Sequence, residues 1–500
     1  MPWLNKYTEI ILVGIVSGVV FGFYQAIPTF PDPDSFYHAR LTALMVQHGV
    51  LSEFPWLPFT TLGEVFTDHH LLYHILLMPF VGTLGPLVGV KVAQAIIAAT
   101  FTIVCYGILK HWKIPYAGIA IIALYSVYPM LVRINLVKAS ALALLLFLVL
   151  LVTLPERRYL AAGIITLLYT MTHGGFLLAI LVAVVVWCAQ LITKSERKPT
   201  GLVLVCVATL VGIVANPYFP ANLPFLWAQF FQIGVVNYQE VIEVGAEWYP
   251  FSLPDLIAVL SLLLLGLVVA GVLAVRRYQT MLADVRIISL TFLFVPLLLL
   301  TLRSRRFVEY LVPVLWLLVC VVVLPAWQRG DIQQLWRTHL KPLGRWATVL
   351  KVYLLLAILF GLLRSYSAVI GEFAAQEPLQ RYAAAGTYLR DHVPADAVIF
   401  HGQWDDFPEL FYHDPTHAYI VGLDPTFLYL ADQAKYQQWV AISGGVDKLN
   451  TAAHIKDYFQ SDYVVIDETE ERTKLMLAYL LRDPTAVELF HQDAIRIFQL

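Results

Sequence analysis

The chain has 500 residues, of which 59% are hydrophobic and 14% charged, and its formal net charge is −2. Soluble globular domains usually hold about 45–50% apolar and about 25% charged residues, so a mean hydropathy of +0.71 excludes that class and indicates a polytopic membrane protein. The weak net charge also argues against nucleic acid as a partner. The four cysteines lie in apolar runs without metal-ligand spacing, which predicts ordinary core positions.

Apolar runs of about 17–25 residues, long enough to cross a bilayer, predict about eleven membrane spans. They lie at residues 7–27, 88–109, 115–131, 138–153, 157–172, 174–193, 200–216, 253–275, 286–302, 307–325 and 346–366. A further apolar run at 71–85 is interpreted as a juxtamembrane helix. If it were a span, several basic loops would lie outside, against the preference of Lys and Arg for cytoplasmic loops.

The predicted fold is therefore a polytopic α-helical membrane domain at 1–366, followed by a small α/β domain at 367–500. With the N-terminus inside and eleven crossings of the cytoplasmic (plasma) membrane, loops 28–87 and 217–252 and the C-terminal domain are external. Short strand-like runs at the C-terminus alternate with helical patterns. These runs lie at 396–402, 418–424, 462–467 and 494–500.

Unusual polar residues gather on the predicted outer side. They are Asp32, Asp34, His38, Arg40, Asp68, His69, His70 and His74 in the first loop, Glu240, Glu243 and Glu247 in the loop 217–252, and Arg303, Arg305 and Arg306 after a late span. Carboxylates and imidazoles are ligands of divalent cations, and arginines bind phosphate through paired hydrogen bonds. The pattern favours a lipid-linked sugar phosphate or diphosphate as ligand, with Mg²⁺ or Mn²⁺ as candidate cofactor.

Structural explanations for the same residues stay open. The arginines could extend toward anionic lipid headgroups, and the glutamates could form a solvated face. Asp68 could cap a helix.

Four short motifs resemble the GT-C superfamily of membrane glycosyltransferases. The run Asp34-Ser35-Phe36-Tyr37-His38-Ala39-Arg40 is similar to the D-x-x-Y-H-x-R pattern in the first external loop of archaeal and bacterial single-subunit oligosaccharyltransferases. VIEVGAEW resembles their glutamate-bearing external loop, and RRFVEY resembles a late arginine that binds the lipid phosphate. HGQWDDFPELF at 401–411 is a loose form of their W-W-D-Y-G signature.

The resemblance implies transfer of a sugar or oligosaccharide from a polyprenyl-linked donor in the membrane lipid to a protein or glycolipid acceptor at the outer face. It assigns catalysis to Asp34 and Glu247, and phosphate binding to Arg306. The acidic pair expected between the third and fourth spans is missing, because YPMLVRINLVKAS holds Arg133 and Lys138 instead. Asp68 is therefore recruited as a third catalytic candidate. The full candidate sets are Asp34, Asp68, His69, His70 and Glu247 for a metal, and Arg306, Arg40, His38, Tyr37, Trp404, Asp405 and Asp406 for substrate.

Two competing functions use the same residues. A transporter or flippase of lipid-linked sugars would bind the headgroup without breaking a bond, and broken helices with ionisable residues inside spans would be its signs. An inactive scaffold protein would keep the fold and lose the chemistry. For Asp405 and Asp406, the motif predicts a position near the first loop, with a helix N-cap as the alternative.

Overall fold

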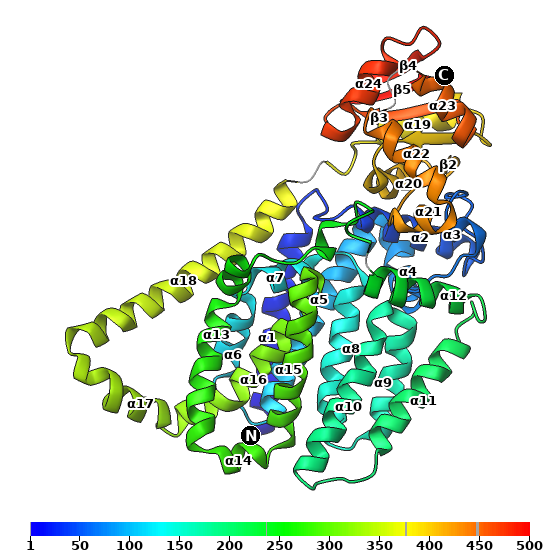
Figure 1. Cartoon of the computed structure of the whole chain (residues 1–500). Coiled ribbons are helices and arrows are strands. Elements are labelled where there is room, and N and C mark those ends of the chain that lie inside the picture. The colour runs from blue at the N-terminus through cyan, green and yellow to red at the C-terminus, as the bar shows by residue number, and fades with distance from the viewer. Residues whose placement is uncertain (1, 237, 376–377, 447–449) are drawn as a thin grey trace. The chain divides into compact units, whose positions relative to one another are not determined.

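The computed structural model describes residues 2–236, 238–375, 378–446 and 450–500 (Figure 1). The chain forms two compact units. The first comprises residues 1–27, 92–217 and 246–375, and the second comprises residues 28–91, 218–245 and 376–500. Most of the predicted external loops 28–87 and 217–252 thus belongs to one compact unit with the C-terminal residues, and residues 246–252 belong to the first unit.

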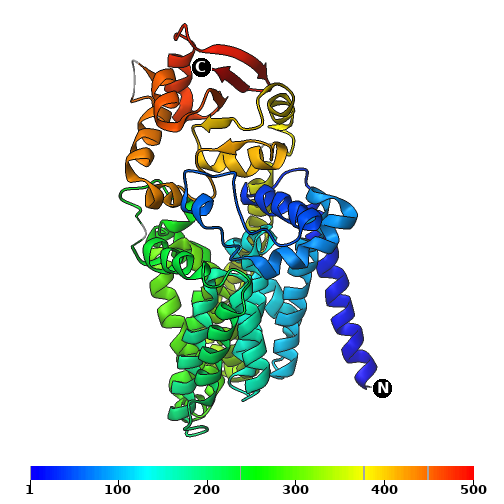
Figure 2. The same cartoon turned by 90° about the vertical axis from the view of Figure 1, so that its right-hand side faces the viewer.

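The first unit is a helical bundle. Its helices are α1 (Pro2–Gln25), α5 (Pro86–His111), α6 (Ala117–Tyr125), α7 (Tyr128–Asn135), α8 (Ala139–Thr153), α9 (Tyr159–Thr172), α10 (Leu177–Ile192), α11 (Thr200–Val214), α13 (Leu253–Arg276), α14 (Tyr278–Leu282), α15 (Val285–Arg303), α16 (Val308–Gln328), α17 (Asp331–Leu335) and α18 (Arg345–Ala374), with the first turns of α5 in the second unit. Helix α16 is the central helix, since 83% of its apolar window is buried. Helix α1, drawn in blue, lies at the edge of the bundle (Figure 2).

Seven helices in the described part of the chain are long and apolar enough to cross a membrane. They are Thr8–Gln25, Pro86–His111, Gly174–Ile192, Leu253–Arg276, Val285–Arg303, Arg305–Gln328 and Arg345–Ala374. Helices α8, α9 and α11 fall at predicted spans but have only 14 or 15 residues. At about 1.5 Å per residue each covers about 22 Å, less than the hydrocarbon core of about 30 Å. The protein is an integral membrane protein, and the count of eleven crossings stays a prediction.

The predicted span 115–131 is broken. Helices α6 and α7 pass the length and hydropathy test only together, and they are bent by 84° at the short break between them. Pro129 lies in the first turn of α7, where proline is tolerated. Ser126 ends α6, and its carbonyl accepts the Ser365 hydroxyl of α18 at 2.6 Å. The break places the second half, with Arg133, on a helix of its own.

The second unit combines short helices with one sheet. Its helices are α2 (Asp34–His48), α3 (Thr61–Glu64), α4 (Leu71–Leu84), α12 (Asn222–Trp227), α19 (Ala383–His392), α20 (Phe407–His413), α21 (Thr426–Ala431), α22 (Gln433–Ser443), α23 (Thr451–Phe459) and α24 (Lys474–Leu480). The predicted helix at 71–85 is α4. It ends at Gly85, whose φ of 80° favours glycine, and Pro86 then begins α5.

The sheet has strands β1 (Val398–His401), β2 (Ala418–Tyr419), β3 (Tyr463–Asp467), β4 (Val487–Gln492) and β5 (Ile495–Gln499) in the order β2-β1-β3-β5-β4. Strands β1, β2 and β3 run parallel, and β5 lies antiparallel to both β3 and β4. Four of the five strands lie at the predicted positions, and the prediction did not include β4. The residues of β3 are almost all buried, as expected of a central strand rich in valine and isoleucine.

The first-loop segment and the C-terminal segment share an apolar core. Helix α2 packs against α20, and the Trp56 ring contacts Phe411 at a centroid distance of 4.9 Å. Hydrogen bonds join the same segments: the Trp56 indole N–H donates to the carbonyl of Pro415 at 2.7 Å, and the Tyr419 N–H donates to the carbonyl of Trp56 at 2.8 Å. These contacts explain why the two segments form one unit.

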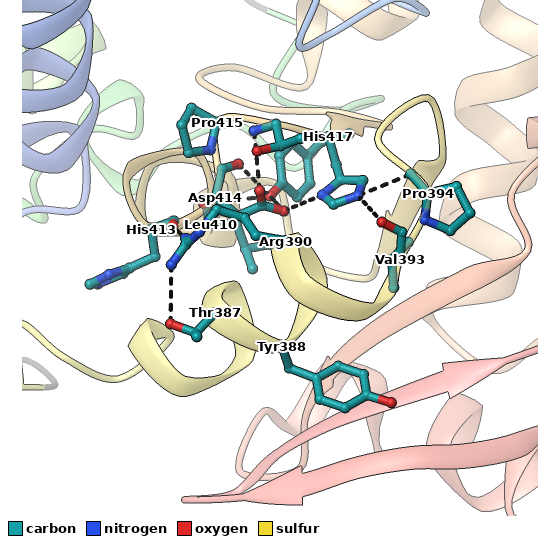
Figure 3. A network of polar contacts seen from close by, with 12 residues as sticks. Thr387, Tyr388, Arg390, Val393, Pro394, Leu410, His413, Asp414, Pro415 and His417 are labelled. Carbon is teal, nitrogen blue, oxygen red and sulfur yellow. Dashed lines mark hydrogen bonds and ion pairs between the residues drawn. The ribbon is translucent and has the colours of Figure 1, made fainter.

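A buried polar network stabilises the chain after α20 (Figure 3). The Asp414 carboxylate accepts a hydrogen bond from His417 Nδ1 at 2.6 Å and another from the Tyr419 hydroxyl at 3.2 Å. His417 Nε2 faces the carbonyl of Pro394 at 3.1 Å. Because both ring nitrogens face acceptors, the geometry favours the doubly protonated imidazolium.

Candidate functional site

Asp34 stands at the beginning of α2 in the second unit. The Asp32 side chain accepts a hydrogen bond from the Asp34 N–H at 2.9 Å. This N–H belongs to the first residue of α2 and has no acceptor within the helix. His38 follows one turn later on the same face of the helix. Tyr37 is buried among aromatic rings, including that of Phe54 at 6.2 Å. The Asp34 carboxyl is partly exposed, whereas Tyr37 and His38 are buried.

A buried chain of hydrogen bonds joins three of the motif residues. Asp68 Oδ2 lies 2.7 Å from His74 Nδ1, and His74 Nε2 lies 2.7 Å from His38 Nδ1. With neutral imidazoles, the carboxylate accepts from His74, and His74 then accepts from His38, so the ring of His38 turns its unprotonated Nε2 away from His74. The chain fixes the orientation and tautomer of His38.

Three of the predicted metal ligands, Asp68, His69 and His70, contact one another or neighbouring residues of the second unit. Asp68 uses one carboxylate oxygen for His74 and the other for the N–H of His70 at 2.9 Å. The His69 ring stacks beside His70, with centroids 3.7 Å apart, and beside Phe225. Among the residues that the structure describes, no three His, Cys, Asp or Glu side chains are arranged to hold a metal ion. The hydrogen bond to His70 closes the turn before α4, but the N-cap position of α4 is His70 and has no side-chain capping bond, so Asp68 is not the helix cap of the structural alternative.

In the first unit, two arginines converge on Glu247. This glutamate lies on the 3₁₀ turn η3 (Ala246–Trp248), Arg133 on α7, and Arg306 on the 3₁₀ turn η4 (Arg305–Phe307). Arg133 Nη1 lies 2.6 Å from Glu247 Oε2, and Arg306 Nη1 lies 3.5 Å from Oε1. Arg133 Nε also donates to Glu309 Oε2 at 2.8 Å. The Arg306 guanidinium stacks on the Trp248 ring at 4.7 Å from its centroid.

Electrostatics keep Glu247 ionised. Burial acts to raise the pKa of its carboxyl, but the positive charges of Arg306, Arg133 and Lys138 outweigh burial and hold the pKa well below the usual range. The backbone of the turn is also fastened, because the Ser304 hydroxyl donates to the Glu247 carbonyl at 2.9 Å. The carboxylate is therefore an anion held by cations.

The other two arginines of this turn differ from Arg306. Arg303 is exposed, as expected of a side chain at the end of a span. Arg305 donates from its guanidinium to the carbonyls of Tyr249 and Pro250, each at 3.2 Å.

Trp404, Asp405 and Asp406 form the 3₁₀ turn η7 (Trp404–Asp406) directly after β1, at the carboxyl edge of the parallel strands. Ligand sites of α/β domains usually lie at this edge. Asp405 is exposed, and the negative charges that face it include Glu470 and Asp34. The prediction that this turn lies near the first loop agrees with the packing of α20 on α2.

Asp406 is buried and accepts the Tyr382 hydroxyl at 2.9 Å. It occupies the N-cap position of α20 but makes no side-chain capping bond, so the helix-cap alternative does not describe it. Burial first, and the charge of Asp405 second, raise the pKa of Asp406 well above its usual range.

Arg40 was predicted to bind substrate, and its guanidinium is engaged elsewhere in the second unit. Its Nε donates to the carbonyl of Tyr412 at 2.8 Å, and the group stacks 4.9 Å from the centre of the Tyr412 ring. These contacts satisfy a carbonyl in the last turn of α20. Arg40 thus joins α2 to α20, and substrate binding by Arg40 stays a prediction.

Three residues of these clusters had no role in the sequence-based prediction. Arg133 was noticed only because a carboxylate was missing there, and His74 was named only as a loop histidine. Glu309 lies inside a predicted span, and a carboxylate within an apolar run is itself a functional signal. It is 2% exposed, so Arg133 is the partner that makes its burial tolerable.

Taken together, the helical bundle and the mixed sheet define the class of protein: an integral membrane protein with the fold of the GT-C glycosyltransferases, as the motifs predicted. No protein-family model matches the sequence, and no curated protein is similar enough to it to count as a relative. The fold is recognised by comparison with solved structures.

Three membrane glycosyltransferases illustrate the likeness. The Archaeoglobus fulgidus oligosaccharyltransferase in the apo form has a TM-score of 0.66 at 12% identity, over 96% of this chain and 72% of that one. ArnT from Cupriavidus metallidurans, bound to undecaprenyl phosphate, has a TM-score of 0.58 at 15% identity, over 98% of both chains. The mycobacterial arabinofuranosyltransferase AftD has a TM-score of 0.60 at 15% identity, over 98% of this chain and 40% of that one.

Proposed function

We propose that the protein transfers a sugar or oligosaccharide from a polyprenyl phosphate or diphosphate carrier to an acceptor at the outer face of the cytoplasmic membrane. The observation that carries the proposal is the pair of arginines that converges on one anion within a GT-C fold. ArnT is seen with undecaprenyl phosphate, and the archaeal oligosaccharyltransferase AglB with a dolichol phosphate and an inhibitory peptide. Proteins of this fold can thus bind polyprenyl phosphates, which supports a polyprenyl-linked donor.

Arg306 has the geometry of a phosphate-binding residue. Its guanidinium lies over the Trp248 ring, and the planar guanidinium of arginine can form paired hydrogen bonds to an anion. In the proposed reaction the bond between the anomeric carbon and the phosphate oxygen breaks, and the electron pair stays on the phosphate. Arg306 stabilises the negative charge that develops there.

Asp34 is the proposed general base for an acceptor hydroxyl. It takes the hydroxyl proton as the acceptor oxygen forms its bond to the anomeric carbon. Trp404 and Asp405, at the strand edge in the same unit, are the proposed acceptor-binding residues. Tyr37 and His38 support Asp34 from the same helix, and Asp68 acts on His38 through His74.

The proposal is tested with purified protein and a polyprenyl-diphosphate sugar donor. Asp34→Asn is expected to lower the rate of transfer by about 10²–10⁴, the usual contribution of a general base, with an unchanged melting temperature. Asp32→Asn is the matched control, because an asparagine oxygen still accepts the Asp34 N–H. Transfer by Asp34→Asn at the wild-type rate would remove Asp34 from the chemistry.

A divalent cation stays a prediction. The oligosaccharyltransferase from Archaeoglobus fulgidus has been solved with zinc and sulfate, but the carboxylates here are bound to His74 and to arginines. No step of the proposed reaction is assigned to a metal. Chelation tests the prediction: activity lost with EDTA and restored by Mg²⁺ or Mn²⁺ would confirm the cofactor, and full activity in EDTA would contradict it.

Transport of a lipid-linked sugar is a second candidate, and one observation favours it. Helices α6 and α7 are bent by 84°, with Arg133 on the second half, and a broken helix with an ionisable residue is typical of transporters. The donor assay separates the two functions, since a transferase releases the polyprenyl phosphate or diphosphate and a transporter moves the intact donor across a vesicle membrane.

A further inference from the structure

The two-arginine cluster of the first unit holds more than one phosphate-binding side chain. Resting on the proposed function, we infer that Arg133 and Arg306 hold the donor phosphate together, and that Glu247 occupies them until the phosphate displaces it. Glu247 is then a competitor for the phosphate site.

The first argument is the shape of the contact. A carboxylate offers two oxygens to two separate guanidinium groups, one at 2.6 Å and one at 3.5 Å. A phosphate presents oxygens of the same kind, and arginine binds both anions through the same planar edge. The place that Glu247 fills is therefore a ready anion site.

The second argument is the difference between the two glutamates that contact Arg133. Glu309 is 2% exposed and contacts Arg133 Nε at 2.8 Å, so it fixes the direction of the guanidinium. Glu247 is 27% exposed at its side chain and contacts the terminal Nη1. Arg133 Nη1 can therefore exchange Glu247 for a phosphate, while the buried Glu309 stays bound to Nε. Glu309 is thus a positioning residue for Arg133.

The third argument is the way the turn is held. The backbone of Glu247 is bonded to Ser304, and the Arg305 N–H donates to the Tyr249 carbonyl at 3.0 Å. The turn can stay in place while the flexible side chain of Glu247 rotates away. Exchange then requires no loop opening, only a change of side-chain rotamer.

The fourth argument is charge. Arg133, Arg306 and Lys138 carry three positive charges around Glu247, and Glu247 and Glu309 carry two negative charges. A dianion, such as the diphosphate of a polyprenyl-diphosphate donor or farnesyl phosphate, would leave this cluster with net negative charge. If Glu247 leaves as the phosphate enters, the cluster is neutral. Exchange is therefore favoured over simultaneous binding in a partly desolvated site.

The alternative is a purely structural ion-pair network that joins α7, η3 and η4. The two hypotheses predict opposite results for Glu247→Gln. If the network is purely structural, the variant is less stable and its affinity for phosphate does not rise. A displaced competitor, once neutral, leaves both arginines to the phosphate, so affinity rises.

The test measures binding of farnesyl phosphate to the detergent-purified full chain by calorimetry. Glu247→Gln is expected to lower the Kd about twofold to fivefold, which corresponds to removing one partly exposed ion pair. Arg133→Gln and Arg306→Gln should each raise the Kd, and Glu309→Gln should raise it less, since it acts through Arg133. Glu240→Gln, an exposed glutamate of the same external segment, is the matched control and should change nothing.

A second variant keeps the inference testable if Glu247→Gln does not fold. Glu247→Asp keeps the charge but draws the carboxylate back from Arg133, so it too should bind the probe more tightly than wild type. An unchanged or raised Kd in both variants, at wild-type melting temperature, overturns the inference while the proposed function stands. If wild-type protein neither binds farnesyl phosphate nor transfers sugar, the proposed function itself fails.

Discussion

At the scale of single residues, Asp406 shows how burial changes the state of a carboxyl group. Its pKa is raised above that of an ordinary aspartate, so the folded protein binds the carboxyl proton more tightly than the unfolded chain does. Stability therefore falls as the pH rises from the unfolded pKa toward the folded pKa.

We expect Asp406→Asn to melt at the same temperature as wild type or higher at neutral pH. The amide keeps an acceptor for the Tyr382 hydroxyl and has no proton to lose. Asp406→Ala should lose about 1–3 kcal/mol, because the Tyr382 hydroxyl is then buried without this partner. Thermal unfolding followed by circular dichroism checks both. A destabilised Asn variant would show that the ionised form is native.

His417 makes the opposite kind of contribution. Burial acts to lower its pKa, but the hydrogen bond and charge of Asp414, with the carbonyls of Val393 and Pro394, outweigh burial and raise the pKa. The raised pKa stabilises the folded state fully below the unfolded value of about 6.5. This contribution is lost as the pH rises through the folded pKa.

As the pH rises from about 6.5 through the folded pKa of His417, the melting temperature of wild type is therefore expected to fall by more than that of His417→Gln. The comparison with the variant removes the contributions of all other groups. Equal pH slopes for both proteins would contradict the imidazolium assignment.

At the scale of elements, the placement of α4 decides the side on which the later loops lie. It is apolar but has only 14 residues, and Gly85 separates it from Pro86, the first residue of α5. A helix of this length covers about 21 Å, short of the bilayer core of about 30 Å. Its packing against α2 also gives it a partner outside a spanning bundle.

We expect cysteines introduced at Val50 and at Leu84 to react with a membrane-impermeant maleimide from the same, outer side of intact cells. Both positions are exposed. A cysteine at Lys194, in the loop predicted to be cytoplasmic, should react only after the membrane is opened. The native cysteines should be replaced first. Labelling of Val50 and Leu84 from opposite sides would mean that α4 crosses the membrane.

At the scale of the whole molecule, the C-terminal residues do not complete their own core. Phe407 and Phe411 of α20 pack against Phe54 at centroid distances of 6.2 Å and 5.7 Å. These partners come from the first-loop segment, together with the hydrogen bonds of Trp56. The compact unit is therefore assembled from three separate stretches of the chain.

An isolated fragment of residues 378–500 is expected to expose this apolar surface. We predict that it binds the dye ANS and shows weak amide-exchange protection in α20, whereas the same residues in the full chain are protected. Adding residues 28–91 through a flexible linker should restore protection. A fragment that is equally protected alone would show that the C-terminal residues form an independent domain.

The sequence by itself determined the membrane class, most of the helix positions and four of the five strands, because hydropathy and local periodicity are properties of contiguous residues. Short motifs also nominated Asp34, Glu247 and Arg306, whose roles stay predictions. The short length of α8, α9 and α11 and the break between α6 and α7 were not predicted, because an apolar run does not show where its helix begins, bends or ends.

Only the tertiary structure decided which distant residues face one another. Arg133 and Glu309 are 176 residues apart in sequence and 2.8 Å apart in space, and Asp68 reaches His38 through His74. The same holds for the division into compact units, since the segment 28–91 finds its apolar partners near the end of the chain. Ion pairing and core packing act between surfaces that only folding brings together, so local pattern carries no signal of them.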